Sequence, residues 1–320
     1  MTTAVIIINW NSGALLVKCL QHLERQTVQP DRILVIDNAS SDNFCICSEL
    51  LANVTLRRLN SNLGFAGGNN LALSECNTDL IATLNPDAFP DPEWLEQLLT
   101  AASAYPDVAA FGSRQLSFED IGILDGAGDT YHISGLVWRN RFGKQQQAED
   151  LVPREIFSPC AAAALYRRQA LVDIGGFDDA FFCYIEDVDL GFRLRLAGHK
   201  SMYVPKAMVR HIGSATTSGQ PSDFSAYHGH RNLVWTFFKN MPGLLFWLLL
   251  PLHLLLNLST IIGYVARGKG SMILRAKIDA VKGLPRVWSK RKQIQAGRTA
   301  TIQDIWRILD KRFIISKYGR

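Results

Sequence analysis

Carboxylate residues stand directly after two apolar runs of the sequence. Asp37 follows residues 33–36, and Asp87 follows residues 80–84 through Asn85 and Pro86. Carboxylate oxygens suit Mg²⁺ or Mn²⁺, and a cation held in this way can bridge two phosphate oxygens. The Asn-Pro-Asp tripeptide is also typical of a simple turn, because Asp caps turns well. These residues are therefore candidates for a metal and phosphate site, with a turn as the alternative.

A second group of acidic residues stands at the expected start of a helix. Glu186, Asp187 and Asp189 fall within four positions, after the aromatic run 181–184. One carboxylate here could deprotonate a hydroxyl group, and the aromatic rings could line a sugar pocket. Acidic residues in a first helical turn also interact favourably with the helix dipole. The segment by itself leaves both interpretations open.

His211 and a glycine-rich segment add two further candidates. His211 ends a strand-like run, and a neutral imidazole ligates Mn²⁺ beside carboxylates, although a single histidine more often has a structural role. Residues 62–70 could let backbone N–H groups approach a phosphate at a helix start. They lack the spacing of a dinucleotide fingerprint and the lysine of a P-loop, which argues against oxidoreductases and P-loop NTPases.

The elements that must position these residues alternate between strand and helix. This alternation predicts an α/β fold with a mostly parallel sheet, in which Asn9, Asp37 and Asp87 meet at the carboxyl edge where ligands bind. Asp91 as N-cap and Pro92 at the first position predict another helix start. The expected strands are residues 4–8, 33–36, 54–59 and 80–84. The expected helices are 15–23, 170–176, 186–198 and one that follows the glycine-rich turn 64–68 and ends at about residue 76.

Two stretches have a weaker pattern. Residues 112–156 show poor periodicity and predict long loops with short edge strands, and residues 200–211 predict one or two short strands. The chain as a whole is 48% hydrophobic and 20% charged, which is the balance of a packed globular protein and excludes a disordered chain.

Charge is segregated along the chain. Residues 1–266 hold 19 Lys and Arg against 26 Asp and Glu, whereas residues 267–320 hold 15 against 3, a net charge of +12. The basic tail follows residues 244–265, which form an apolar stretch long enough to cross a bilayer, although Pro251, His253 and Asn257 interrupt it. Residues 267–298 interleave apolar residues with ten cations.

This pattern predicts association with an anionic membrane surface from the cytoplasmic side. No secretory leader precedes the first strand, and a full crossing would place the basic tail outside, against the bias that keeps Lys and Arg in the cytosol. We therefore expect a peripheral or monotopic protein with a broken, in-plane or re-entrant segment. A buried core helix or a dimer interface is the alternative. Binding of nucleic acid by the tail is disfavoured, because the neighbouring apolar segment favours lipid headgroups.

The motifs, taken jointly, resemble the family 2 glycosyltransferases, and specifically the bacterial rhamnosyltransferase-like branch, over about residues 3–217. The resemblance rests on residues 7–11 (IINWN), 35–42 (VIDNASSD), 62–69 (NLGFAGGN), 84–87 (LNPD), 175–178 (GGFD), 184–190 (YIEDVDL) and His211.

The resemblance implies a GT-A fold, which is Rossmann-like with a mostly parallel sheet, an inverting reaction and a nucleotide-sugar donor. It implies a transferase domain at 1–225, followed by an apolar and basic helical region at 226–320 that associates with the membrane. The residues implied to bind the nucleotide sugar are Asn9, Trp10, Asp37, Asn62, Gly64, Asn69 and Asn85.

The same resemblance assigns the catalytic and metal roles. Asp187 matches the catalytic base, and Glu186 matches its neighbour in acceptor binding. Asp87 and His211 match the ligands of a divalent metal, Mg²⁺ or Mn²⁺. Asn85 replaces the first carboxylate of the family's Asp-x-Asp motif, so we expect weaker metal binding and a greater reliance on His211 or on the donor's phosphates.

The expected activity is transfer of L-rhamnose from dTDP-rhamnose to a lipid-linked or polysaccharide acceptor in cell-envelope glycan synthesis. UDP-galactofuranose, a UDP-hexose or a UDP-N-acetylhexosamine are alternative donors for the same scaffold. A non-catalytic nucleotide-sugar-binding subunit is the alternative from another class of protein.

Overall fold

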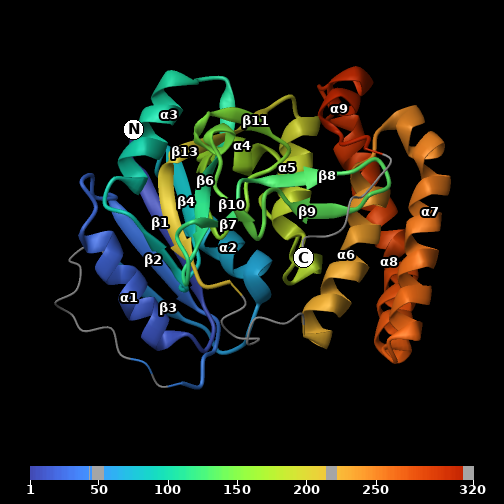
Figure 1. Ribbon diagram of the computed structural model, residues 1–320, viewed down its shortest axis with the longest axis horizontal. Helices are drawn as coiled ribbons and strands as arrows, with labels where there is room; N and C mark the ends of the chain where they lie inside the picture. Colours follow the sequence, from blue (N-terminus) through green and yellow to red (C-terminus); the bar gives the residue numbers. More distant parts are fainter. Residues whose placement is uncertain (43, 45–53, 214–221, 313–320) are drawn as a thin grey trace.

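The computed structural model describes residues 1–42, 44, 54–213 and 222–312. Figure 1 shows a layered α/β body, with strands at its centre, beside a group of C-terminal helices. Within the described residues, eleven strands form one sheet, and two further strands, β8 (Asp129–Tyr131) and β9 (Val137–Arg139), pair separately.

The N-terminal half of the sheet is parallel, as the sequence predicts. Its strands lie in the order β4-β1-β2-β3, and Asn9 at the end of β1 is in register with Asp37 at the end of β2. The strands are β1 (Thr3–Asn9), β2 (Arg32–Asp37), β3 (Val54–Arg58) and β4 (Leu80–Leu84).

Helices cover both faces of this half, and β1 divides its side chains between them. Val5 and Ile7 belong to a core that includes α1 and α3, whereas Ile6 and Ile8 belong to a core that includes α2 and α5. Burial on both faces explains the apolar runs of β1, β2 and β4, whereas the edge strand β3 is partly exposed. The helices are α1 (Gly13–Glu24), α2 (Gly64–Glu75), α3 (Trp94–Ala104), α4 (Arg168–Asp173) and α5 (Glu186–Leu196).

The second half of the sheet is mixed. β12 (Ala163–Arg167) pairs antiparallel with β4 and with β6 (Val108–Ser117), and β13 (Lys200–His211) pairs parallel with β6. Shorter strands extend this half. They are β5 (Ala88–Pro90) and β11 (Arg154–Ile156), which pair with β13, β7 (Ile123–Gly126), which pairs with β6, and β10 (Lys144–Gln145), which pairs with β7.

Two expectations about these segments need correction. Residues 112–117 belong to β6, an inner strand of ten residues and not a loop or an edge. Ser113 and Gln115 are buried in it, and these polar residues hid the apolar pattern. Residues 200–211 form one long strand, with a shift of register between Val204 and Met208.

The start of α3 also differs from the expected position. The helix begins at Trp94 with Glu93 as N-cap, and the side chain of Asp91 does not cap it. The backbone N–H of Asp91 instead donates to the carbonyl oxygen of Met208 on β13 at 3.1 Å. Tertiary pairing with β13 therefore holds Asp91 and Pro92 outside the helix.

The C-terminal helices pack against the body through a shared core. Tyr131, Phe157 and Phe192 of the body lie in one apolar cluster with Phe237 and Phe246. Figure 1 shows these helices side by side along one flank of the sheet. They are α6 (Asp223–Asn240), α7 (Gly243–Ala266), α8 (Gly270–Ala296) and α9 (Ile302–Ile308).

The apolar segment forms one continuous helix, α7, so the expectation of a broken helix is wrong. Pro251 lies inside α7 without ending it. His253 points toward the body, where its Nδ1 lies 2.8 Å from the carbonyl oxygen of Ser134 and its ring stacks on Phe237. Asn257 accepts a hydrogen bond from Lys277 at 2.6 Å. His253 and Asn257 thus face protein and do not interrupt the outer face of α7.

By length and composition, α7 is the one helix of the described residues that could cross a membrane. Its most apolar 18-residue window has a mean hydropathy of 2.0, and 22% of that window is buried inside the protein. The alternative of a buried core helix is therefore wrong.

Candidate active site

The carboxyl ends of β1 and β2 place two predicted residues in direct contact. The amide Nδ2 of Asn9 donates to Asp37 Oδ1 at 3.1 Å and to the hydroxyl of Ser40 at 3.1 Å. Both Asn9 and Asp37 are buried. Trp10, the next residue, is 47% exposed, so its ring is available at the rim of this edge.

The glycine-rich segment forms the N-terminus of α2 beside this edge. Asn62 Oδ1 accepts the backbone N–H of Gly64 at 2.7 Å. Gly64 has a φ of +73°, and a Cβ there would lie 2.4 Å from the carbonyl oxygen of Phe182. Glycine is therefore required both for the backbone conformation and for the close approach of a second loop.

Asn38 is a buried residue of this edge that sequence reasoning missed. Its amide Nδ2 donates to the carbonyl oxygen of Gly64 at 2.9 Å, and its Oδ1 accepts from Leu63 N–H at 3.2 Å. Asn38 thus ties the end of β2 to the glycine-rich turn. Its place beside Asp37 in the 35–42 motif was the available signal.

Two predicted asparagines occupy different positions. Asn69 lies within α2, buried, where its amide donates to Phe65 O at 2.9 Å and its Oδ1 has no partner among the described residues. Asn85 follows β4, and its backbone N–H donates to Ala162 O at 2.9 Å. Asn85 is partly exposed at the sheet edge, whereas the side chain of Asn69 is buried within α2.

Asp87 and His211 lie together at the ends of neighbouring strands. His211 Nε2 is 3.3 Å from Asp87 Oδ1, and its Nδ1 is 2.8 Å from Asp125 Oδ2. Asp125 in turn accepts from Arg139 NH1 at 2.6 Å. A chain of alternating charges therefore runs from Asp87 through His211 and Asp125 to Arg139.

The alternation favours the charged form of each of these side chains. Burial alone would lower the pKa of His211, but hydrogen bonds to Asp125 and Asp87 raise it to about 9. Burial alone would raise the pKa of Asp125, but Arg139 and His211 lower it to about 2. The pKa of Asp87 is also lowered, since His211 outweighs the effect of burial.

The pair formed by Asp87 and His211 fits a divalent cation that draws further ligands from a substrate. A carboxylate oxygen and an imidazole nitrogen 3.3 Å apart are a donor set that would suit Mn²⁺ once the cation displaces the proton that the two carboxylates favour on His211. Across the described residues, no group of three or more His, Cys, Asp or Glu side chains could hold a metal by itself. This agrees with the general habit of Mg²⁺ in phosphate sites, where one or two carboxylates act together with substrate phosphates and water.

Asp187 and Glu186 lie at the start of α5. Asp187 Oδ2 accepts from Ala161 N–H at 3.1 Å, and its Oδ1 accepts from Val188 N–H at 2.8 Å. The residue next to Ala161, Ala162, is the one that pairs with Asn85. The acidic start of α5 therefore lies beside the edge that carries Asn85 and Asp87.

Burial raises the pKa of the carboxyl groups at the start of α5, and Asp187 raises the pKa of two of its neighbours further. Burial, and then Asp187, raise the pKa of Glu186 well above the ordinary value, and Glu186 Oε2 has no hydrogen-bond partner in the described part of the chain. Burial also raises the pKa of Asp187, against the opposing effect of its N–H donors and of Arg139. Asp129, buried nearby on β8, has a pKa raised by burial and by Asp187. A raised pKa makes these carboxyl groups better proton acceptors than ordinary ones.

The backbone that leads to Glu186 is strained. Phe182, Tyr184 and Ile185 have φ values of +65°, +65° and +69°, which side chains with a Cβ rarely adopt. Phe182, with ψ of −67°, forms a tight γ-turn in which Cys183 N–H donates to Phe181 O at 2.8 Å. Each such residue costs about 1–3 kcal/mol, and strain of this kind concentrates at functional sites.

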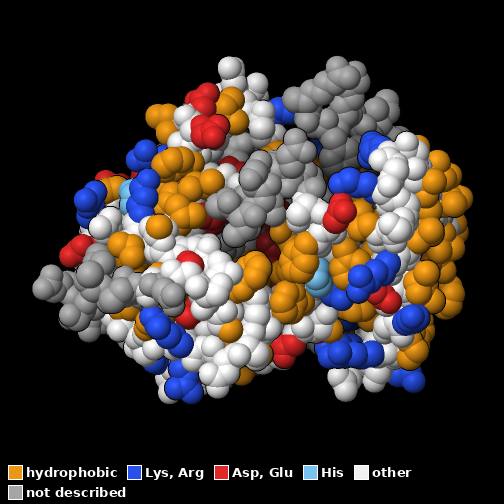
Figure 2. Space-filling view, turned by 90° about the horizontal axis from the view of Figure 1, so that it is seen from below, with side chains coloured by type: hydrophobic (Ala, Val, Ile, Leu, Met, Phe, Trp, Pro, Cys, Tyr) orange, Lys and Arg blue, Asp and Glu red, His pale blue; other side chains and the backbone are white. Residues whose placement is uncertain are grey.

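The structure thus joins most of the predicted residues into one edge and adds, besides Asn38, three that were missed. Asp125, Asp129 and Arg139 come from the segment that the sequence left as loops. The signal that could have found them was the acidic, glycine-rich run 125–129, but its spacing carried no period. Figure 2 shows a hollow between the sheet body and the helices, with acidic side chains visible at depth.

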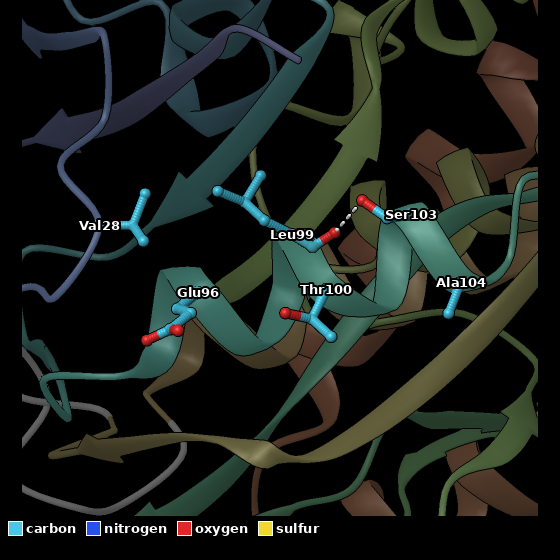
Figure 3. Close-up of a pocket in the computed structure, with 6 residues that line it drawn as sticks. All are labelled: Val28, Glu96, Leu99, Thr100, Ser103 and Ala104. Carbon is cyan, nitrogen blue, oxygen red and sulfur yellow. Dashed lines mark hydrogen bonds between the residues drawn. The ribbon is translucent and has the colours of Figure 1, made fainter.

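A surface depression of about 580 Å³ lies elsewhere, along α3 (Figure 3). Its acidic residue, Glu96, already accepts a hydrogen bond from Thr27 at 2.7 Å, and Ser103 bonds back to Leu99 within the helix. It contains none of the residues discussed above, and we assign it no part in the site. It is lined by Val28, Glu96, Leu99, Thr100, Ser103 and Ala104.

Comparisons with known proteins agree with this geometry. Residues 4–175 match the family model described as Glycosyl transferase family 2. The chain is 30% identical, over 247 residues, to N-acetylglucosaminyl-diphospho-decaprenol L-rhamnosyltransferase of Mycobacterium tuberculosis, which covers 70% of this chain and 80% of that protein. It is 28% identical, over 219 residues, to the O-antigen chain rhamnosyltransferase RfbN of Salmonella typhimurium, covering 68% of each.

The fold is also found among solved structures. The crystal structure of GalNAc-T7 with UDP, GalNAc and Mn²⁺ superposes with a TM-score of 0.61 at 15% identity, covering 75% of this chain and 48% of that one. The mixed, mostly parallel sheet flanked by helices is therefore the GT-A fold. By its sequence, its fold and the residues gathered at its sheet edge, this chain belongs to glycosyl transferase family 2, as a rhamnosyltransferase-like glycosyltransferase.

Proposed function

We propose that the enzyme transfers L-rhamnose, with inversion, from dTDP-rhamnose to a lipid-linked acceptor in cell-envelope glycan synthesis. The observation that carries the proposal is the similarity to the mycobacterial rhamnosyltransferase, whose name specifies both the sugar and a polyprenyl-diphosphate acceptor. A second rhamnosyltransferase at 28% identity supports the same sugar.

In this proposal the sheet edge holds the donor. Asn9 and Trp10 line the nucleotide pocket, Asp37 binds the pyrimidine, and the segment from Asn62 to Asn69 borders the ribose and diphosphate. Asn85 contacts the diphosphate sugar beside the metal ligands. The support lies in the contacts of Asn9 with Asp37 and of Asn62 with Gly64, which fix the carboxyl edge and the helix N-terminus.

Asp87 and His211 hold the divalent cation, Mg²⁺ or Mn²⁺. When bound, the cation would neutralise the negative charge of the departing diphosphate. Asp125 and Arg139 keep His211 in place from behind, because Asp125 bonds the imidazole nitrogen that faces away from Asp87. The Mn²⁺ named with the related GalNAc-T7 structure supports a metal of this kind.

Asp187 is the base. Its carboxylate takes the proton of an acceptor hydroxyl while the oxygen attacks the anomeric carbon, and the bond to the diphosphate breaks on the opposite side. Glu186 binds the acceptor beside it. One carboxylate and one displacement give inversion, so the new glycosidic bond has the configuration opposite to that of the donor.

Thermal stabilisation by donors tests the donor assignment. The purified enzyme is heated with dTDP-rhamnose, UDP-glucose, UDP-galactofuranose or UDP-N-acetylglucosamine, each with and without Mn²⁺, because a ligand bound to the folded state raises Tm. We expect the largest rise with dTDP-rhamnose and Mn²⁺. A larger rise in Tm with a UDP-sugar would show that this UDP-sugar, and not dTDP-rhamnose, is the donor. NMR of the product would check inversion.

We further propose that the enzyme lies on the cytoplasmic face of the plasma membrane, with α7 and α8 in the plane of the interface. The outer face of α7 is apolar, and α8 adds apolar and cationic residues beside it, in keeping with the orange edge and blue patches of Figure 2. The exposed apolar residues are Leu244, Trp247, Leu248, Leu254, Leu255, Leu258, Ile262 and Val265 on α7, and Leu274, Ile278, Val281 and Trp288 on α8.

The inner contacts of α7 support an in-plane helix over a crossing. His253 bonds to Ser134 of the body, and Asn257 bonds to Lys277 of α8, so one side of α7 is occupied by protein along its length. A helix that crossed the bilayer would carry these polar partners into lipid.

Vesicle binding tests this placement with a matched pair of variants. Leu248→Gln with Leu255→Gln alters two outer residues of α7, and Ile121→Gln with Val152→Gln alters two equally exposed residues of the body. We expect the first pair to lose sedimentation with phosphatidylglycerol vesicles and the second to keep it. Equal behaviour of both would defeat the placement, and cleavage of a tag after Arg320 only from the outer side would establish a crossing.

A further inference from the structure

The strained segment 180–185 runs from the short 3-10 helix Asp179–Phe181 to the start of α5, and side chains must satisfy most of its carbonyl groups. The groups that do so come largely from α6. The amide Nδ2 of Asn232 lies 3.0, 3.0 and 2.8 Å from the carbonyl oxygens of Phe181, Cys183 and Tyr184. One fully buried side chain therefore contacts three carbonyl oxygens of the turn.

Arg231 completes this set from the same helix. Its NH2 donates to the carbonyl oxygens of Ala180 at 3.1 Å and Phe181 at 3.0 Å. Of the six carbonyls from Ala180 to Ile185, the one at Phe182 accepts from Ala66 N–H and the one at Ile185 accepts from Asp189 N–H. The carbonyl of Phe181 also accepts from Cys183 N–H within the γ-turn, whereas those of Ala180, Cys183 and Tyr184 contact the two α6 side chains.

Salt bridges farther along α6 hold the helix against α5 and α8. Lys239 Nζ lies 2.5 Å from Asp178 Oδ2 and 2.8 Å from Asp189 Oδ1, and Lys290 of α8 also pairs with Asp178 at 2.5 Å. Asn240 donates to Asp189 at 2.7 Å. Because α6 is fixed on both sides, its side chains can hold a turn that its own backbone does not favour.

We propose that Asn232, assisted by Arg231, is the positioning residue for the catalytic base. It holds Phe182, Tyr184 and Ile185 in their left-handed conformations, and so places Glu186 and Asp187 at the start of α5. Since the helix that carries it packs on α8, the C-terminal helical region takes part in building the active site. This inference rests on the proposed role of Asp187.

The experiment compares Asn232→Ala with Gln26→Ala. Gln26 is also a buried amide that bonds three backbone groups, at Asp91, His22 and Leu95. It follows α1, which begins at the carboxyl end of β1 and runs back to the opposite edge of the sheet. Gln26→Ala therefore removes a similar set of hydrogen bonds away from the base.

We expect Asn232→Ala to lower kcat about 10²-fold, the loss typical of a misplaced reacting group, with donor Kd and donor KM unchanged. Hydrogen–deuterium exchange should rise in peptides covering 180–187 of this variant and stay unchanged there in Gln26→Ala. A kcat near that of the wild type, or an equal loss of kcat in Gln26→Ala, would overturn the proposal.

Arg231→Met provides a milder second variant should Asn232→Ala fail to fold. It removes the bonds to Ala180 and Phe181 and those to Asn232 Oδ1 and His228, but it keeps the Asn232 amide, so kcat should fall by less, again at constant donor Kd. Wild-type kcat in that variant would count against the proposal that these α6 side chains position the base. If no tested donor is turned over by the wild type, the proposed function fails, but the exchange of 180–187 still decides whether Asn232 holds the turn.

Discussion

The pKa values of the carboxyl groups are shifted in opposite directions in the two halves of the active site. At the sheet edge, Asp87 and Asp125 alternate with His211 and Arg139, and the pKa of each carboxyl group is lowered. At the start of α5, Glu186, Asp187 and Asp129 lie near one another, and each pKa is raised. The first half keeps its charge for a cation and a diphosphate, whereas the second half can receive a proton.

The halves also differ in their backbones. Asp87 and His211 stand at the ends of paired strands, where ordinary ladder hydrogen bonds hold them. Glu186 and Asp187 follow three residues of positive φ, which tertiary contacts must hold. We therefore expect substitutions far from the site to disturb the positions of Asp87 and His211 less than the position of Asp187.

The largest effect is expected from Asp187→Asn, which tests the proton-accepting half. Asn keeps the shape of the side chain and an oxygen acceptor for a backbone N–H, but it cannot accept the proton, so kcat should fall at least about 10²-fold. Calorimetry should find the donor Kd unchanged. Transfer at a near wild-type rate would make Asp187 structural and remove the contrast between the halves.

Removal of the metal tests the charge-holding half. Excess EDTA should abolish or strongly reduce transfer, and Asp87→Ala should weaken metal-dependent donor binding more than His211→Ala, because a carboxylate contributes charge as well as a ligand atom. Donor titrations with and without Mn²⁺ measure this. Full activity in excess chelator would contradict the metal assignment.

Substitution of Asp125 is a finer test of the same half of the site. Asp125→Ala removes the partner of His211 Nδ1, and outer partners of this kind typically change metal affinity about 10- to 100-fold. Asp125→Asn keeps an oxygen acceptor and should lose less. Mn²⁺ binding followed by electron paramagnetic resonance, in the presence of dTDP, separates the two variants, and equal affinity in wild type and Asp125→Ala would show that Asp125 does not orient His211.

The smallest effect is expected from Glu186→Gln, and it is a gain of stability. The folded-state pKa of Glu186 lies above its unfolded value, so the ionised side chain destabilises the fold increasingly as pH rises from the ordinary carboxyl range. At pH 8 the variant should be more stable by about 1 kcal/mol, or about 2–4 °C in Tm.

The pH dependence provides the control for this prediction. Near pH 4 both forms carry a neutral side chain, so the difference in Tm should vanish there. Calorimetric scans of both proteins at pH 4, 6 and 8 measure it. A variant that is less stable than the wild type at pH 8 would show that the carboxylate is compensated by a partner.

Much of the parallel half of the sheet could be predicted because β1, β2 and β4 are buried on both faces. Such strands are continuous apolar runs, and the polar residue that ends each run marks the carboxyl edge, as Asn9, Asp37 and Asn85 do. The mixed half could not be predicted in the same way. Ser113 and Gln115 are buried inside β6, where their polar side chains break the pattern that identifies a strand.

The sequence by itself determined the family, the parallel strands, the helix that begins at Glu186 and the apolar segment that became α7. These features are local, since each depends on the order of neighbouring residues. Tertiary structure alone decided the protonation of the site, because burial raises the pKa of Asp187 and because the carboxylates that raise the pKa of His211 are distant in the chain, Asp125 by 86 residues. It also decided the turn before Glu186, whose positive φ values no local pattern favours and whose carbonyls bond to Asn232, about 50 residues later.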